Sequence, residues 1–179
     1  MVIETTRKSY ARNNEPAILN ALIESSKSYQ LFRQLPLLSD LTDQAMQDLY
    51  NCMEERKFTH DDIFYTGGST SSRVIHLVLD GKVNALDPFQ EVFTQLSTGD
   101  VFGVLSFLDG RRPHAATLRA ASDGTLLMLD RCLFDVITLE DPAMGNQLLF
   151  FMFRLLSMTS LKLETEYANM HHFALGRGK

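Results

Sequence analysis

Two short runs hold the residues of this chain whose types and spacing could bind a ligand. In the first, Gly99-Asp100-Val101-Phe102-Gly103, a strand-like stretch ends at a glycine where a short helix can begin. The first amides of a helix have no partner within it and carry the positive end of its dipole, so the backbone N–H groups from Gly103 to Leu105 could hold an anion. In the second run, Arg111, Arg112 and His114 could supply positive charge beside those amides.

Enzymatic chemistry has little support in the sequence. His60 and His76 are scattered, with no HxH pair and no downstream carboxylate at the spacing of a cupin-like metal site. No nucleophile has an adjacent base, and no Walker-type glycine loop occurs. The pair Asp61-Asp62 fits a turn before a strand better than paired catalytic carboxylates. We therefore predict neither a catalytic site nor a metal site, and a protein that is not an enzyme.

The elements around the two runs are mostly short strands. Apolar and β-branched segments are separated by turn pairs such as Gly67-Gly68, Asp80-Gly81 and Asp123-Gly124. The predicted strands are 57–59, 62–66, 74–79, 82–86, 91–96, 115–121 and 125–129. Many short strands at near-regular spacing indicate an antiparallel β-roll, that is, a jelly-roll-like double-stranded β-helix.

Helices are predicted on both sides of these strands, which makes the fold class α+β. One helix is expected over 15–26, a second from a cap at Ser39 or Thr42 to Cys52, a third over 131–139, and a long one from Pro142 to about Met170. The predicted organisation is a flexible tail over 1–14, a β-roll with N-terminal helices over 15–141, a long dimerisation helix over 142–170 and a C-terminal tail over 171–179.

The long helix has too many apolar residues for one buried face. Between Met144 and Leu163 it holds leucine, phenylalanine and methionine at most positions, so it should cover its own domain with one side and a second copy with the other. We therefore predict a homodimer formed through this helix. The alternative is a helix packed only against its own domain.

The runs 99–103 and 113–117 resemble the phosphate-binding cassette of cyclic-nucleotide-binding domains, and the segments 62–68 and 74–83 resemble the strands and glycines that precede it. In that family a glutamate follows the second glycine and holds the ribose, while an arginine before an Ala-Thr or Ala-Ser pair holds the cyclic phosphate. With Ala115, Ala116 and Thr117 setting the register, Val104 and His114 stand at those positions. The resemblance implies that Arg111 or Arg112 replaces the clamp and that the Thr117 hydroxyl donates to the ligand.

The long helix adds a further similarity. Thr159 and Ser160 resemble the Thr-Ser pair with which the catabolite activator family contacts the nucleotide base, which implies that they face the pocket. The alternative is that both hydroxyls bond to preceding carbonyls of their own helix. The segment 171–179 is too short for the DNA-reading domain that follows this helix in that family, so direct DNA binding is not expected.

Composition limits the remaining function classes. The net charge of −5 and the pI near 5.5 disfavour nucleic-acid binding. No run approaches the ~20 apolar residues of a membrane helix, and the N-terminus lacks a secretory signal, so a cytoplasmic protein is expected. The sequence predicts a regulatory module that binds a small anion, with cAMP and cGMP as candidates, and signals through its C-terminal helices. The alternative is a ligand-free pseudo-sensor that serves as a dimerisation or protein-docking scaffold.

Overall fold

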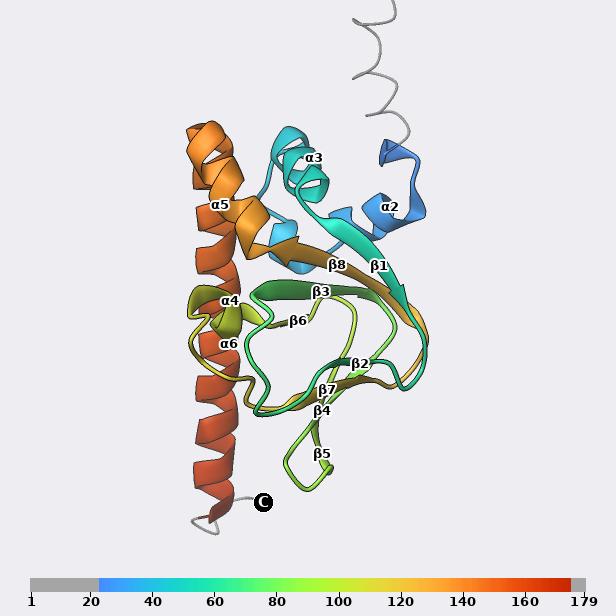
Figure 1. The fold of residues 1–179 in the computed structure, drawn as a ribbon, viewed down its shortest axis with the longest axis vertical. Coiled ribbons are helices and arrows are strands. Elements are labelled where there is room, and N and C mark those ends of the chain that lie inside the picture. Colours follow the sequence, from blue (N-terminus) through green and yellow to red (C-terminus); the bar gives the residue numbers. More distant parts are fainter. Residues whose placement is uncertain (1–22, 175–179) are drawn as a thin grey trace, which may run out of the picture.

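Eight short strands pair into two four-stranded antiparallel sheets that face each other. The computed structural model describes residues 23–174. One sheet has the order β1-β8-β3-β6, from β1 (Glu54–Phe58), β8 (Gly124–Asp130), β3 (Val74–Asp80) and β6 (Val101–Phe102). The other has the order β2-β7-β4-β5, from β2 (Ile63–Tyr65), β7 (Thr117–Ala120), β4 (Val83–Leu86) and β5 (Val92–Leu96). Figure 1 shows the two sheets stacked one above the other as a roll, which confirms the predicted α+β roll.

The strand predictions are confirmed except for one strand. Each of the seven predicted segments overlaps an observed strand, with ends that differ by at most three residues. The sequence did not predict β6, because this strand is two residues long. It lies between Gly99 and Gly103, which both have positive φ, and it pairs with β3 through His76 and Leu77. The glycines therefore enclose a strand as well as a turn.

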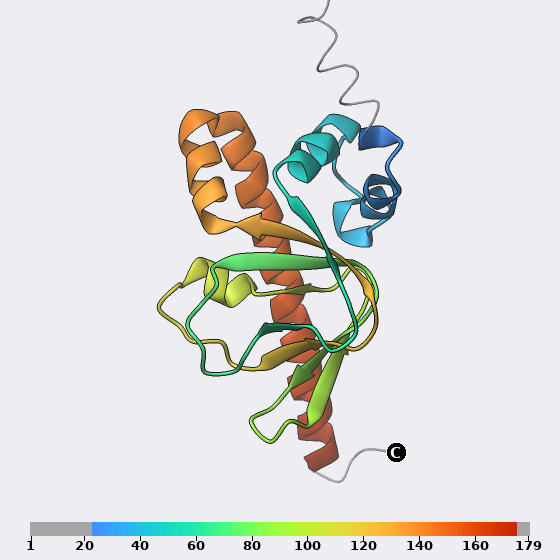
Figure 2. The ribbon, with the colours of Figure 1, turned by 45° about the vertical axis from the view of Figure 1, so that its right-hand side comes forward.

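Helices cover the outer face of the first sheet. Above it lie α2 (Lys27–Arg33), the short 3-10 turn η1 (Pro36–Leu38) and α3 (Asp43–Asn51), as Figure 2 shows. The α3 helix begins after Thr42, whose hydroxyl accepts the backbone N–H of Ala45, as the capping pattern predicted. The α2 helix and η1 were not predicted. The tail over 1–14 and most of the helix predicted over 15–26 lie outside the described residues.

At the C-terminal end, α5 (Arg131–Glu140) leads into the long α6 (Pro142–Ala174). The short α4 (Val104–Leu108) packs against β3, and its Phe107 contacts Phe134 of α5. The α6 helix continues four residues beyond its predicted end, so His171 to Ala174 are helical, whereas a tail was expected there. Figure 1 shows α6 running along one side of both sheets. No helix in the described part of the chain is long and apolar enough to cross a membrane.

The chain buries two separate apolar cores. One lies between the first sheet and the helices, where β3 contributes Ile75, Leu77 and Leu79. The other lies between the two sheets, where β3 contributes Val78 and β6 contributes Phe102. Because β3 is covered on both faces, all its residues from Ile75 to Leu79 are buried. This central strand holds the glycine turn before α4 in place.

Candidate functional site

A cavity of about 550 Å³ lies between α4, the loop before β7 and the side of α6. This volume falls within the range of small-molecule sites, roughly 300–1,000 Å³. Most of the predicted site residues line it: Gly103, Val104, Leu105, Arg112, His114, Ala115, Ala116 and Thr159. The structure adds Tyr65, Val101, Phe102, Ser106 and Pro113. Arg111, Thr117 and Ser160 do not line this cavity, although they were predicted to bind the ligand.

Gly103 fixes the turn at the start of α4. Its φ of +84° lies in the left-handed region, and a Cβ at this position would lie 2.3 Å from the carbonyl oxygen of Val74. Only glycine fits such an approach to neighbouring backbone. The turn therefore places the first residues of α4 directly against β3, with their backbone on the cavity wall.

Val104 stands at the sequence position of the family's glutamate, but its side chain is buried in the core. Its side chain is 4% exposed and belongs to the core between the first sheet and the helices. Leu105, the next residue, is 56% exposed and also lines the cavity. Neither side chain can accept a hydrogen bond from a sugar hydroxyl. The wall formed by α4 therefore offers apolar surface and backbone, and the exposed side-chain position on it belongs to Leu105.

His114 is a neutral residue of the interior, which corrects the expectation that it supplies charge. It is 5% exposed, its ring stacks on Tyr65 with 3.6 Å between centroids, and its Nε2 accepts the backbone N–H of Ser72 at 3.1 Å. Burial lowers the pKa of His114 below its ordinary value of 6.5. Because Nε2 is an acceptor, the proton of the neutral ring lies on Nδ1. This residue therefore provides an uncharged N–H group.

Arg112 is the cation of the cavity rim. Its side chain is 75% exposed and its Nε lies 3.3 Å from Oδ2 of Asp109. Arg111 contacts the same carboxylate at 3.1 Å, but its side chain is 93% exposed and lies outside the cavity lining. The hydrogen bond from Arg111 is the main reason that the pKa of Asp109 is lowered. The two arginines thus differ in access to the cavity while sharing one carboxylate.

The hydroxyl groups predicted to contact a ligand have other partners. Thr117 is buried, and its Oγ1 accepts the backbone N–H of Gly67 at 3.0 Å, so it supports the turn after β2. Thr159 lines the cavity, but its hydroxyl donates to the carbonyl of Leu155 at 2.8 Å, as the alternative interpretation expected. Ser160 is exposed on α6. Of the three, only Thr159 is placed to contact a molecule in this cavity.

His76 was expected to be an ordinary polar residue on a strand, and the structure buries it inside the roll. It is 5% exposed and lies parallel to Phe102 with 4.6 Å between ring centroids. Its Nδ1 has no hydrogen-bond partner. Burial, followed by the positive charge of Arg56, lowers its pKa to about 4. The sequence signal for this burial is the nearly continuous apolar run of β3, which is typical of a strand covered on both faces.

Metal ligation has no structural basis in the described part of the chain, since no group of three histidine, cysteine or acidic side chains lies close enough to hold an ion.

Comparison with known proteins agrees with this architecture. A cyclic nucleotide-binding domain from Methylobacillus flagellatus KT aligns with 84% of this chain and 83% of its own, at 21% identity and a TM-score of 0.66. The regulatory subunit of a cAMP-independent protein kinase A from Trypanosoma brucei aligns with 79% of this chain and 47% of its own, at 19% identity and a TM-score of 0.59.

Among curated proteins, an uncharacterized NTE family protein of Mycobacterium tuberculosis is 27% identical over 125 residues, or 69% of this chain. The present chain spans about a fifth of the length of that relative, which is 21% covered. The family model for the cyclic nucleotide-binding domain matches residues 55–140, which include both sheets, α4 and α5. Over these residues the chain is similar to the cyclic nucleotide-binding domain family, as its sequence pattern implied.

Proposed function

We propose that this domain is a regulatory module that binds a small anionic ligand in the cavity beside α4 and transmits occupancy to α6. The observation that carries the proposal is that both elements line one cavity: Gly103 to Ser106 from α4 and Thr159 from α6. A ligand that fills the space contacts both, and it shifts their relative position if it binds one arrangement more tightly than the other. Arg112 at the rim supplies the attraction for an anion.

The long helix has a fixed half and a free half, which suits this role. Its buried residues all lie between Met144 and Leu155, and Arg154 anchors it by donating to the carbonyl of Leu37 and to Asp40. Beyond Leu155 the side chains are mostly exposed, and Lys162 forms an ion pair with Asp100 at 3.7 Å. Thr159 lies just past the boundary, so a ligand touching it acts on the half that is held less firmly.

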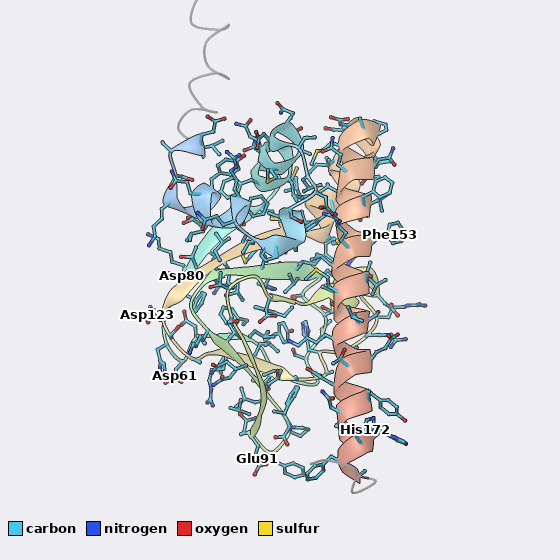
Figure 3. The ribbon with its side chains drawn as sticks, turned by 180° about the vertical axis from the view of Figure 1, so that it is seen from behind. Asp61, Asp80, Glu91, Asp123, Phe153 and His172 are labelled. Atoms are coloured by element: carbon cyan, nitrogen blue, oxygen red, sulfur yellow. The ribbon has the colours of Figure 1, made fainter. Side chains whose placement is uncertain are left out.

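The outer face of α6 supports the homodimer as a further proposal. Leucine or methionine recurs every seven residues, at Leu149, Leu156, Leu163 and Met170, and Leu163 also lines a pocket against β5. Between them lie Phe153, the polar Ser160 and Tyr167. This is the spacing of a coiled-coil seam. Phe153 is 66% exposed and points away from the roll, as Figure 3 shows. Sedimentation should give a dimer for the wild type and a monomer for Phe153→Ser, and a monomeric wild type would overturn the proposal.

The test of ligand binding uses thermal unfolding of the full chain with a panel of small organic anions that includes cAMP and cGMP. A ligand at ten times its Kd stabilises the folded state by about 1.4 kcal/mol, which is roughly 3–6 °C for a chain of this size. At least one anion should give this shift in the wild type and in Arg111→Ala, whose side chain lies outside the cavity. Ala115→Trp, which places a large ring at an exposed position of the cavity wall, should remove the shift.

A scaffold without a ligand is the second candidate, because neutral His114 and buried Val104 remove the two polar contacts that the family uses. If no anion stabilises the wild type while the dimer persists, the scaffold is the better account. If stabilisation occurs equally in Ala115→Trp, the anion binds elsewhere and the proposed site is wrong.

A further inference from the structure

The cavity wall carries little charge for a nucleotide site. Among the described residues that line it, Arg112 is the one with a charged side chain, and no carboxylate lies on the wall. The uncharged polar groups are the hydroxyls of Tyr65, Ser106 and Thr159 and the ring N–H of His114. Burial raises the pKa of Tyr65, so its hydroxyl keeps its proton. The hydroxyl oxygens can accept hydrogen bonds from a ligand, but no lining side chain is a carboxylate, which is the stronger acceptor for a ribose hydroxyl.

Two of these hydroxyls are already used within the protein. Ser106 donates to the carbonyl of Gly103 at 3.0 Å, and Thr159 donates to the carbonyl of Leu155. A nucleotide would bring a ribose hydroxyl and a base edge that donate hydrogen bonds, and the described lining offers them neutral hydroxyl oxygens in place of a charged carboxylate. Polar groups that lose water without gaining a partner weaken binding considerably.

The rest of the wall is apolar. Val101, Phe102, Leu105, Pro113 and Ala116 surround the space between the two sheets and α6. An apolar body gains from leaving water for such walls, and a single anionic head can remain at the rim beside the exposed guanidinium of Arg112. Asp109, which already contacts this guanidinium, is shared with Arg111, so Arg112 can turn to a ligand without leaving the carboxylate unpaired.

We infer that the ligand of this cavity is a monocarboxylate with an apolar body, such as a medium-chain fatty acid, and not a nucleotide. The inference rests on the proposed function, because it names the chemical class of the ligand for the same site. Its basis is the combination of one rim cation, a described lining without a carboxylate and an apolar interior. The carboxylate lies at Arg112, and the chain extends past Leu105 toward Phe102.

Calorimetric titration of the full chain with hexanoate, octanoate, octylamine, cAMP and cGMP tests this inference. Octanoate should bind more tightly than either nucleotide and than octylamine, which has the same chain with the opposite charge. The two methylenes that octanoate has beyond hexanoate should strengthen its binding about 15-fold. Arg112→Ala should weaken octanoate binding about tenfold, allowing for the exposure of this side chain, while Arg111→Ala should leave it unchanged.

Two further variants separate the cavity from the apolar outer face of α6. Octanoate binding should be lost in Ala115→Trp and retained in Phe153→Ser. The reverse result would place the fatty acid on the outer face of α6 and overturn the inference. Tighter binding of cAMP or cGMP than of octanoate, dependent on Ala115 and Arg112, would overturn the inference while supporting the proposed function. If none of the five probes binds, the inference is overturned. If, in addition, no anion of the thermal-unfolding panel stabilises the wild type, the proposed function is overturned as well.

Discussion

Acid should destabilise this domain through His76, and the size of the effect follows from its burial. The pKa of His76 is about 4 in the folded chain, against an ordinary value of 6.5 when the chain is unfolded. Below pH 6.5 the unfolded state therefore binds a proton that the folded state does not, and the folded state loses stability as the pH falls towards 4. Above pH 6.5 both states are neutral at this residue, and the contribution no longer changes.

The two pKa values give a loss of about 2 kcal/mol between pH 7 and pH 5, and about 3 kcal/mol once the pH is well below 4. Two kcal/mol is a substantial part of the 5–15 kcal/mol that typically stabilises a domain. Urea denaturation, followed by far-UV circular dichroism, should be measured at both pH values on the wild type and on His76→Phe. The phenylalanine keeps a ring against Phe102 and cannot titrate.

Other groups also titrate in this interval, including His114, whose pKa is lowered by burial as well. They are common to both proteins, so the difference between the two pH-dependent losses isolates His76. The wild type should lose about 2 kcal/mol more than His76→Phe between pH 7 and pH 5. Equal losses in the two proteins, with equal denaturant slopes, would show that His76 is not buried and neutral in the folded state.

Three further predictions concern the cavity wall. Gly103→Ala should lower the free energy of unfolding by at least about 2 kcal/mol in urea denaturation, because the new Cβ meets the Val74 carbonyl. The control is Gly68→Ala, which has a similar φ but open space around the new Cβ. Its free energy of unfolding should fall only by the cost of placing alanine in the left-handed region. Val104→Glu should destabilise the fold by about 3 kcal/mol or more because it buries a carboxylate, whereas Leu105→Glu should stay within about 0.5 kcal/mol in the same assay. The affinity of a bound anion should not change between pH 7 and pH 8 by calorimetry, because His114 is neutral throughout; a decrease over this interval would indicate a charged His114.

The sequence predicted the roll well because its signals are local. Turn pairs such as Asp80-Gly81 and Asp123-Gly124 mark the strand ends, and the cap at Thr42 marks the start of α3. The strand β6 was missed because two residues are too short to show any periodicity. Residues of the cassette run line the cavity, and Gly103 must be a glycine for reasons of backbone geometry alone.

The side-chain roles in the site were harder to predict because they depend on contacts between distant segments. Arg111 and Arg112 are adjacent in the sequence, and only the path of the loop decides that Arg112 lines the cavity. Val104 and Leu105 are both apolar neighbours, and the rotation of a five-residue helix decides which one is exposed. A resemblance aligns positions along a chain, but a shift of about 100° around a helix exchanges the buried and exposed side chains.

The two interior histidines show why residue type alone cannot assign charge. His114 stands at a position where the family has a cation, yet its backbone partner Ser72 and its stacking on Tyr65 favour the neutral ring. His76 lies on a strand that is covered by helices on one face and by the second sheet on the other, so no choice of face could expose it. Desolvation acts in the same direction on both rings. The interior of this roll is therefore uncharged at neutral pH, and any anion that enters must be attracted from the rim, where Arg112 lies.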